Sequence, residues 1–246
     1  LEGMDSISKS LASYSSTVNQ YADKINNALL PIAAVIILTF FLFDMMSWNR
    51  RLGQEGGSLT IQLWMEVALG YILAFMLVYY SSEIFDVIVY FFNKGITLVN
   101  SVLPKTGFKS DIDTSGVSGW IMKQIVNLVG TGTQFVGDIS AGIIAFLRFF
   151  QMYILKAVAP ILTALFMSEK TRNITINFLK LFAAYAFQGL LLVIVIKLYP
   201  ALVSDDMFKA GKGDLVTAFA SIGKSVVYIM CLFGSQKQAK TLLNAM

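Results

Sequence analysis

The sequence predicts an all-α, polytopic integral membrane protein with about five transmembrane helices plus short amphipathic helices. Hydrophobic residues make up 56% of the 246 positions, charged residues make up 14%, and the mean hydropathy is +0.68. A soluble domain of this length needs more charge to cover its surface. Several apolar runs approach the ~20 residues that a helix needs to cross a bilayer core. Lipid is therefore the expected solvent for much of the surface.

Residues 4–27 are predicted to form an N-terminal amphipathic helix. Apolar residues recur here every three or four positions, which is the pattern of an amphipathic helix. Such a helix either lies on the membrane or on a partner, or it extends the first spanning helix at its N-terminal end. The apolar residues that recur every three or four positions are Ile7, Leu11, Tyr14, Val18, Tyr21 and Ile25.

Residues 28–80 are predicted to contain the first two transmembrane helices. The first is expected from Leu29 to Met46, with Pro31 in its first turn, where the missing N–H costs little. The second is expected over residues 62–80, because aromatic residues stand at both of its ends, as they do at membrane interfaces.

Residues 81–137 are predicted to be an extracytoplasmic or interfacial segment. Residues 84–103 and 120–129 have the pattern of amphipathic helices, and a polar loop over 104–118 separates them. A pair of re-entrant helices is the alternative for this segment.

Residues 138–246 are predicted to form a three-helix transmembrane core with a cytoplasmic C-terminal tail. The spans are expected at 138–167, 174–202 and 215–233. The first of these is too long for one straight crossing, so it begins outside the bilayer, tilts, or kinks at Pro160.

The positive charges predict the orientation of the chain. Loops that follow the first and third spans, together with the C-terminal tail, have the highest density of Lys and Arg, and such segments stay in the cytoplasm. The N-terminus is therefore predicted outside and the C-terminus inside. The basic residues concerned are Arg50, Arg51, Lys170, Arg172, Lys237 and Lys240.

Charged residues inside the predicted spans are the candidates for function. Arg148 and Lys156 fall in the third span, where they could line a path for a polyanion such as single-stranded DNA. Alternatively, Arg148 extends to the outer interface and Lys156 pairs with an acid. Asp44, Glu66 and Lys180 lie near the cytoplasmic ends of three spans and could form one structural ion-pair cluster.

Small and amide side chains are candidates for helix packing. Gln188-Gly189 in the fourth span offers close helix approach and an amide that bonds across helices, and Pro160 offers a bend. Lys197 and Lys224 are expected to extend to the outer interface.

The residue inventory gives no reason to expect an enzyme. The sequence has no histidine, which is the commonest general base and the commonest transition-metal ligand. Cys231 lies within an apolar run and is interpreted as a small packing residue. No catalytic residue, cofactor or metal site is therefore predicted.

The most distinctive sequence pattern lies between Lys156 and Leu202. It consists of short motifs that occur in the order Ala159-Pro160, Ser168-Glu169-Lys170-Thr171, Asn177-Phe178-Leu179-Lys180, Tyr185-Ala186-Phe187-Gln188-Gly189 and Leu198-Tyr199. This order resembles the TrbL-like conjugal transfer proteins, the polytopic inner-membrane subunits of type IV secretion systems. It is most similar to the versions carried by conjugative elements of Gram-positive bacteria.

The resemblance implies a channel or scaffold subunit that helps move single-stranded DNA, or protein, across the plasma membrane. The implied partners are the other membrane subunits of the secretion system, the coupling protein and the secretion ATPases. A ring-like homo-oligomer is expected, because five helices alone cannot enclose a path wide enough for DNA. A small-solute transporter, an ion channel and a non-pore membrane assembly factor remain the alternatives.

Overall fold

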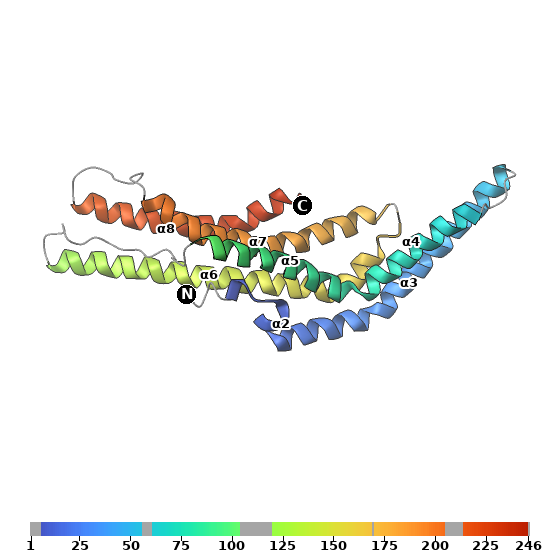
Figure 1. The fold of residues 1–246 in the computed structure, drawn as a ribbon, viewed down its shortest axis with the longest axis horizontal. Helices are drawn as coiled ribbons and strands as arrows, with labels where there is room; N and C mark the ends of the chain where they lie inside the picture. Colours follow the sequence, from blue (N-terminus) through green and yellow to red (C-terminus); the bar gives the residue numbers. More distant parts are fainter. Residues whose placement is uncertain (1–5, 56–60, 104–119, 169, 205–213, 246) are drawn as a thin grey trace. The chain divides into compact units, whose positions relative to one another are not determined.

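The computed structural model describes residues 6–55, 61–103, 120–168, 170–204 and 214–245, and the regular structure within these residues is helical (Figure 1). The prediction of an all-α polytopic membrane protein is thereby confirmed. The predicted polar loop over 104–118 lies outside the described residues. The helices are α2 (Leu11–Tyr14), α3 (Ser16–Glu55), α4 (Ile61–Tyr79), α5 (Ser81–Val102), α6 (Trp120–Ala164), α7 (Arg172–Ser204) and α8 (Asp214–Leu242).

The chain divides into two compact units. Unit 1 comprises Leu1–Lys9, Phe91–Phe149 and Ala184–Leu242, and unit 2 comprises Ser10–Tyr90, Phe150–Ala183 and Leu243–Met246. Helices α5, α6 and α7 therefore contribute residues to both units.

Each unit has its own apolar core. In unit 1, Ile96, Ile144 and Leu192 are almost completely buried, together with Ile7 from the N-terminal segment. In unit 2, Ile37 of α3 and Ala74 of α4 are fully buried. Burial of apolar surface between helices of the same unit thus positions the polar residues described below.

The first spanning helix is longer than the apolar run that predicted it. Helix α3 begins at Ser16, so residues 16–27 form its N-terminal extension, which is one of the two arrangements that fitted the sequence. Pro31 consequently lies inside α3 and not in a first turn, which corrects that prediction. Proline is tolerated inside membrane helices because neighbouring groups satisfy the carbonyl that it frees.

Helices α4 and α5 meet at a sharp bend. Residues 67–79 and 81–102 are inclined by 71° to each other across a break at Tyr80. The two helices therefore make either one broken span or a re-entrant pair.

Helices α6 and α7 form the helical hairpin that the sequence predicted. Its turn is held from both sides, since Thr171 Oγ1 donates to the Leu165 carbonyl at 2.7 Å and Thr175 Oγ1 donates to the Leu162 carbonyl at 2.6 Å. Helix α6 runs from Trp120 without a break, so the boundary drawn at 137/138 falls inside it. At this boundary a Cβ added at Gly137 would make an ordinary van der Waals contact with the Tyr228 ring, at 3.6 Å.

Three described helices are long and apolar enough to cross a membrane, or four if the bent pair is one span. They are Ser16–Arg50, Ile139–Ala164 and Arg172–Val203, and the bent pair is Val67–Tyr79 with Ser81–Val102. The fifth predicted span, over 215–233, lies in α8, which is not among these candidates in the part of the chain that the structure describes.

Candidate functional site

Lys156 of α6 lies at the centre of a polar network in unit 2. Its side chain is completely buried. The Nζ atom donates to Asn19 Oδ1 at 3.1 Å and to both carboxylate oxygens of Asp86 at 3.0 Å, and it lies 3.0 Å from Asp23 Oδ1. An ammonium group has three N–H bonds. Asn19, Asp23 and Asp86 are therefore enough to satisfy all of them.

The two acids of this network come from α3 and α5. The Asp23 side chain is 34% exposed and the Asp86 side chain is 51% exposed, whereas the lysine between them is at 0%. Exposed carboxylates require water or lipid headgroups beside them. The buried ammonium thus faces a polar edge of unit 2, where two negative charges balance one positive charge.

Pro160 explains a second contact of Lys156. In an unbroken helix the Lys156 carbonyl would accept from the N–H of residue 160, and proline has none. The buried Asn26 of α3 supplies the missing donor, because its Nδ2 lies 2.8 Å from the Lys156 carbonyl oxygen. Pro160, predicted as a helix-packing residue, therefore opens a hydrogen-bonding position that another helix occupies.

Asn26 also holds the bend between α4 and α5. Its Nδ2 lies 3.1 Å from Ser81 Oγ, and Ser81 is the first residue of α5. In the next position Ser82 Oγ donates to Asp23 Oδ1 at 2.8 Å. One polar face of α3 thus connects the start of α5 to the middle of α6.

Sequence reasoning allowed Lys156 to pair with an acid but did not identify Asp23 and Asp86 as its partners. The signal that could have found them is a polar stripe at helical spacing. Asn19, Asp23 and Asn26 follow one another at intervals of four and three residues, so they lie on one face of α3.

Arg148 of α6 is 1% exposed and lies in unit 1. Its Nη1 donates to the Ile7 carbonyl at 3.2 Å, and its guanidinium lies 4.7 Å from the centre of the Phe149 ring. In the same unit, Asn93 Nδ2 donates to the Lys9 carbonyl at 3.0 Å. Two side chains from α5 and α6 therefore hold residues 7–9 of the N-terminal segment.

Gly189 of α7 makes room for the Arg148 guanidinium. A Cβ added at Gly189 would lie 1.9 Å from Arg148 Nη1 and 2.4 Å from its Cζ. The small residue predicted to allow close helix approach thus lies against a buried cationic side chain. The neighbouring Gln188 is 2% exposed, and its Oε1 has no hydrogen-bond partner among the described residues.

The predicted cluster of Asp44, Glu66 and Lys180 is not visible as an ion-paired group. Asp44 Oδ2 accepts from the Tyr71 hydroxyl at 2.7 Å, and Lys180 is exposed. Among the described side chains neither of these two residues takes part in an ion pair. The side chain of Glu66 lies outside the described residues.

Two further lysines of unit 1 bind the C-terminal ends of helices. Lys197 is 7% exposed and its Nζ donates to the Leu103 carbonyl at 3.3 Å, just after α5 ends. Lys224 Nζ donates to the Val203 carbonyl at 3.5 Å, near the end of α7. Cations are favourable there because the last carbonyls of a helix carry partial negative charge.

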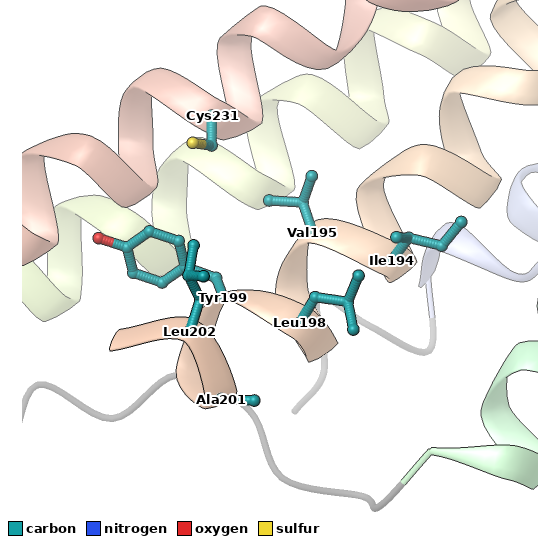
Figure 2. A pocket seen from close by; sticks show the side chains of 7 residues that line it. All are labelled: Ile194, Val195, Leu198, Tyr199, Ala201, Leu202 and Cys231. Atoms are coloured by element: carbon teal, nitrogen blue, oxygen red, sulfur yellow. The ribbon is translucent and has the colours of Figure 1, made fainter. Parts of the chain in front are cut away.

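An apolar hollow of about 520 Å³ lies between α7 and α8 within unit 1 (Figure 2). None of the described residues that line it is charged, so these residues offer nothing to bind the phosphates of a nucleic acid. Cys231 of α8 faces it, and the α7 residues that line it are Ile194, Val195, Leu198, Tyr199, Ala201 and Leu202. Among the described residues no group of His, Cys, Asp and Glu could hold a metal ion.

Long apolar helices with buried, paired charges define a multi-pass membrane protein. The comparison with protein families gives the particular class. Residues 80–238 match the model of the TrbL/VirB6 plasmid conjugal transfer proteins, so the chain belongs to this family. The resemblance inferred from residues 156–202 is thereby confirmed. No curated protein matches the chain.

Membership in the family makes the protein a membrane component of a conjugal transfer, or type IV secretion, system. Members of this family are structural subunits of secretion systems and are not known as enzymes. The family also implies association with other subunits of such a system.

Proposed function

We propose that this chain is a channel or scaffold subunit that helps move single-stranded DNA, with or without bound protein, across the plasma membrane. The family match over residues 80–238 carries the proposal, and the long apolar helices support it. Its partners are the other membrane subunits, the coupling protein and the secretion ATPases, which supply the energy. Several copies of the chain associate to surround a path of sufficient width.

Capture of the transferring strand tests this function. Donor cells that carry an epitope-tagged chain are treated with formaldehyde during mating, the chain is recovered, and the bound DNA is quantified by PCR. We expect the transferred strand to be enriched over a non-transferred plasmid, and we expect the enrichment to vanish in a donor without relaxase. Enrichment on the coupling protein but not on this chain would contradict a role as a channel subunit.

A non-pore scaffold is the second candidate, and a specific observation favours it. In this structure the ammonium of Lys156 is engaged by Asn19, Asp23 and Asp86, and the guanidinium of Arg148 binds the Ile7 carbonyl. Both residues are used within the chain, although the sequence had made them candidates for a path. The role as a channel subunit and the role as a scaffold predict different effects of substituting Asp86, which pairs with Lys156.

Variants of Lys156 and Asp86 separate the two roles. If Lys156 contacts DNA, Lys156→Met lowers transfer at least tenfold while the oligomer stays intact, and Asp86→Asn leaves transfer unchanged. If Lys156 ties helices together, each single variant lowers the free energy of unfolding by about 1–3 kcal/mol. The double variant is then less destabilised than the sum of the two single variants. Transfer frequency and thermal unfolding of the purified protein in detergent are the two measurements.

A further inference from the structure

The apolar hollow between α7 and α8 lies at one end of a membrane span. Helix α7 carries polar residues as far as Lys180, and the apolar stretch that follows, residues 181–203, extends over about 34 Å. This length matches the hydrocarbon core of a bilayer, which is about 30 Å thick, so Val203 lies at its boundary. The α7 residues that line the hollow fall between 194 and 202 and cover about 12 Å. The hollow therefore runs from this boundary through most of one leaflet.

The walls of the hollow are fixed against each other within unit 1. The rings of Tyr199 and Tyr228 have their centres 5.2 Å apart, and both residues are buried in the apolar core of the unit. The Tyr199 hydroxyl also donates to the Lys224 carbonyl, which ties α7 to α8 at a second point. A ligand that enters such a pre-formed site loses little free energy in ordering its walls.

The width of the hollow selects a thin ligand. A volume of about 520 Å³ distributed over about 12 Å gives a mean cross-section of about 40 Å², or a width of about 7 Å. An α-helix with its side chains is about 10–12 Å across, so a helix of a second copy does not fit. A single extended hydrocarbon chain does fit between the α7 side chains and Cys231 of α8 (Figure 2).

A lysine lies at the membrane boundary beside the hollow. Lys224 Nζ donates to the Val203 carbonyl at 3.5 Å, and Val203 directly follows Leu202, which lines the hollow. Because Val203 ends the apolar stretch of α7, the ammonium lies at the depth of the lipid headgroups. An apolar slot and a positive charge therefore stand next to each other at the interface.

This combination distinguishes the hollow from the rest of the lipid-facing surface. Apolar residues alone confer no preference inside a bilayer, because the lipid chains around them are equally apolar. A cation beside a slot of the width of one chain adds a contact that the phosphate of a bound lipid makes and that a hydrocarbon alone does not.

We propose that the hollow binds one acyl chain of a membrane phospholipid and that the Lys224 ammonium contacts the phosphate of the same molecule. An ammonium group has three N–H bonds, so its bond to the Val203 carbonyl is compatible with a bond to phosphate. This site goes beyond the role in DNA transfer and does not depend on it.

Cys231 reports whether the hollow is occupied. It is the single cysteine of the sequence, it is exposed, and it lines the hollow. The protein is purified in detergent, stripped of lipid and reacted with N-ethylmaleimide at increasing concentrations of dioleoyl phosphatidylglycerol, and mass spectrometry gives the rate of modification. We expect the lipid to slow the reaction by about fivefold or more, because a bound chain covers the thiol. An unchanged rate would overturn the proposal.

A second cysteine distinguishes a site from general coverage by lipid. Ala68 is an exposed residue of the candidate span in α4 and does not line the hollow. In a Cys231→Ser chain that carries Ala68→Cys, the same lipid should change the rate by less than about twofold. Equal slowing at both positions would mean that lipid covers the apolar surface uniformly, and the site would have to be abandoned.

The phosphate contact is tested on the natural chain and on variants of Lys224. Dioleoylglycerol has the same chains but no phosphate, so it should protect Cys231 only at concentrations about fivefold higher or more. Lys224→Gln should raise the phosphatidylglycerol concentration needed for protection by a similar factor, and Lys224→Arg should restore it. Equal protection of the natural chain by the two lipids would overturn the contact, whether or not the glutamine variant folds.

Filling the hollow gives an independent test. Ala201→Trp places a large side chain among the lining residues, so native mass spectrometry should show the loss of the adduct of one phospholipid that the natural chain retains. The matched variant Ala68→Trp adds the same side chain outside the hollow and should keep the adduct. Circular dichroism verifies that both variants are folded. A folded Ala201→Trp chain that keeps the adduct would refute the site.

Discussion

At the scale of single residues, the Arg148 side chain in unit 1 depends on the absence of a side chain at Gly189. The Arg148 guanidinium occupies the space that a side chain at residue 189 would need, and it reaches the Ile7 carbonyl from there. A buried cation needs such fixed partners, because moving it elsewhere within an apolar environment is costly. The absence of a Cβ at Gly189 is therefore part of how the N-terminal segment is held.

The first prediction concerns Gly189→Ala. The added Cβ forces the buried guanidinium to move and lose its hydrogen bond to the Ile7 carbonyl, which costs about 1.5–3 kcal/mol of stability. The higher helix propensity of alanine offsets about 0.5–1 kcal/mol of this loss. The measurement is thermal unfolding in detergent. Gly142→Ala is the control, since nothing lies within 4 Å of a Cβ added there. It should stabilise α6 by about 0.5–1 kcal/mol.

A second variant makes this prediction specific. In an Arg148→Met background the guanidinium is absent, so Gly189→Ala should cost clearly less than it does in the natural chain. Equal shifts of the unfolding temperature for Gly189→Ala and Gly142→Ala would show that the guanidinium moves freely.

At the scale of helices, a proline in one helix is matched by an asparagine in another. Pro160 removes the donor that the Lys156 carbonyl needs, and Asn26 of α3 replaces it at 2.8 Å while also bonding Ser81 Oγ at 3.1 Å. Asn26 is 1% exposed, so neither water nor lipid headgroups can take over its role without rearrangement. This contact connects α3, the start of α5 and α6 within unit 2.

The second prediction concerns Asn26→Ala. The variant leaves a buried carbonyl without a donor, so we expect a loss of about 1–3 kcal/mol and faster proteolysis at the bend between α4 and α5. The neighbouring Asn27 is exposed, so Asn27→Ala should be nearly neutral. In a Pro160→Ala background the N–H of residue 160 returns to the Lys156 carbonyl, and Asn26→Ala should then cost less. An unchanged cost in that background would contradict the matched role of the two residues.

At the scale of the whole molecule, the number of crossings decides on which side the C-terminus lies. Three spans, like the five that the sequence predicts, put the two termini on opposite sides, whereas four put them on the same side. The bent pair of α4 and α5 and the helix α8 are therefore the elements that matter for topology.

The third prediction is that the N-terminus lies outside and the C-terminus lies in the cytoplasm, because the loops with the densest Lys and Arg are retained there. Enzyme reporters fused after Gly53, Thr171 and Met246 should report the cytoplasm, and fusions near Lys109 and Lys209 should report the outside. The same location for both termini would reject this topology.

The sequence by itself determined the class, the family and most of the helices of this protein. Hydropathy is a local property, so the apolar runs predicted the hairpin of α6 and α7. The sequence motifs within residues 156–202 were enough to indicate the family. Spacing of apolar residues also predicted the helical character of residues 16–27 and 84–102.

Only the tertiary structure decided which polar groups meet. Lys156 and Asp86 are 70 residues apart, and Asn26 lies 130 residues before the carbonyl that it satisfies. Hydrophobic periodicity states which face of a helix is buried, but it does not state which other helix covers that face. The pairing of Lys156 with Asp23 and Asp86 depends on the N-terminal extension of α3, which carries Asp23, and on α5, which carries Asp86.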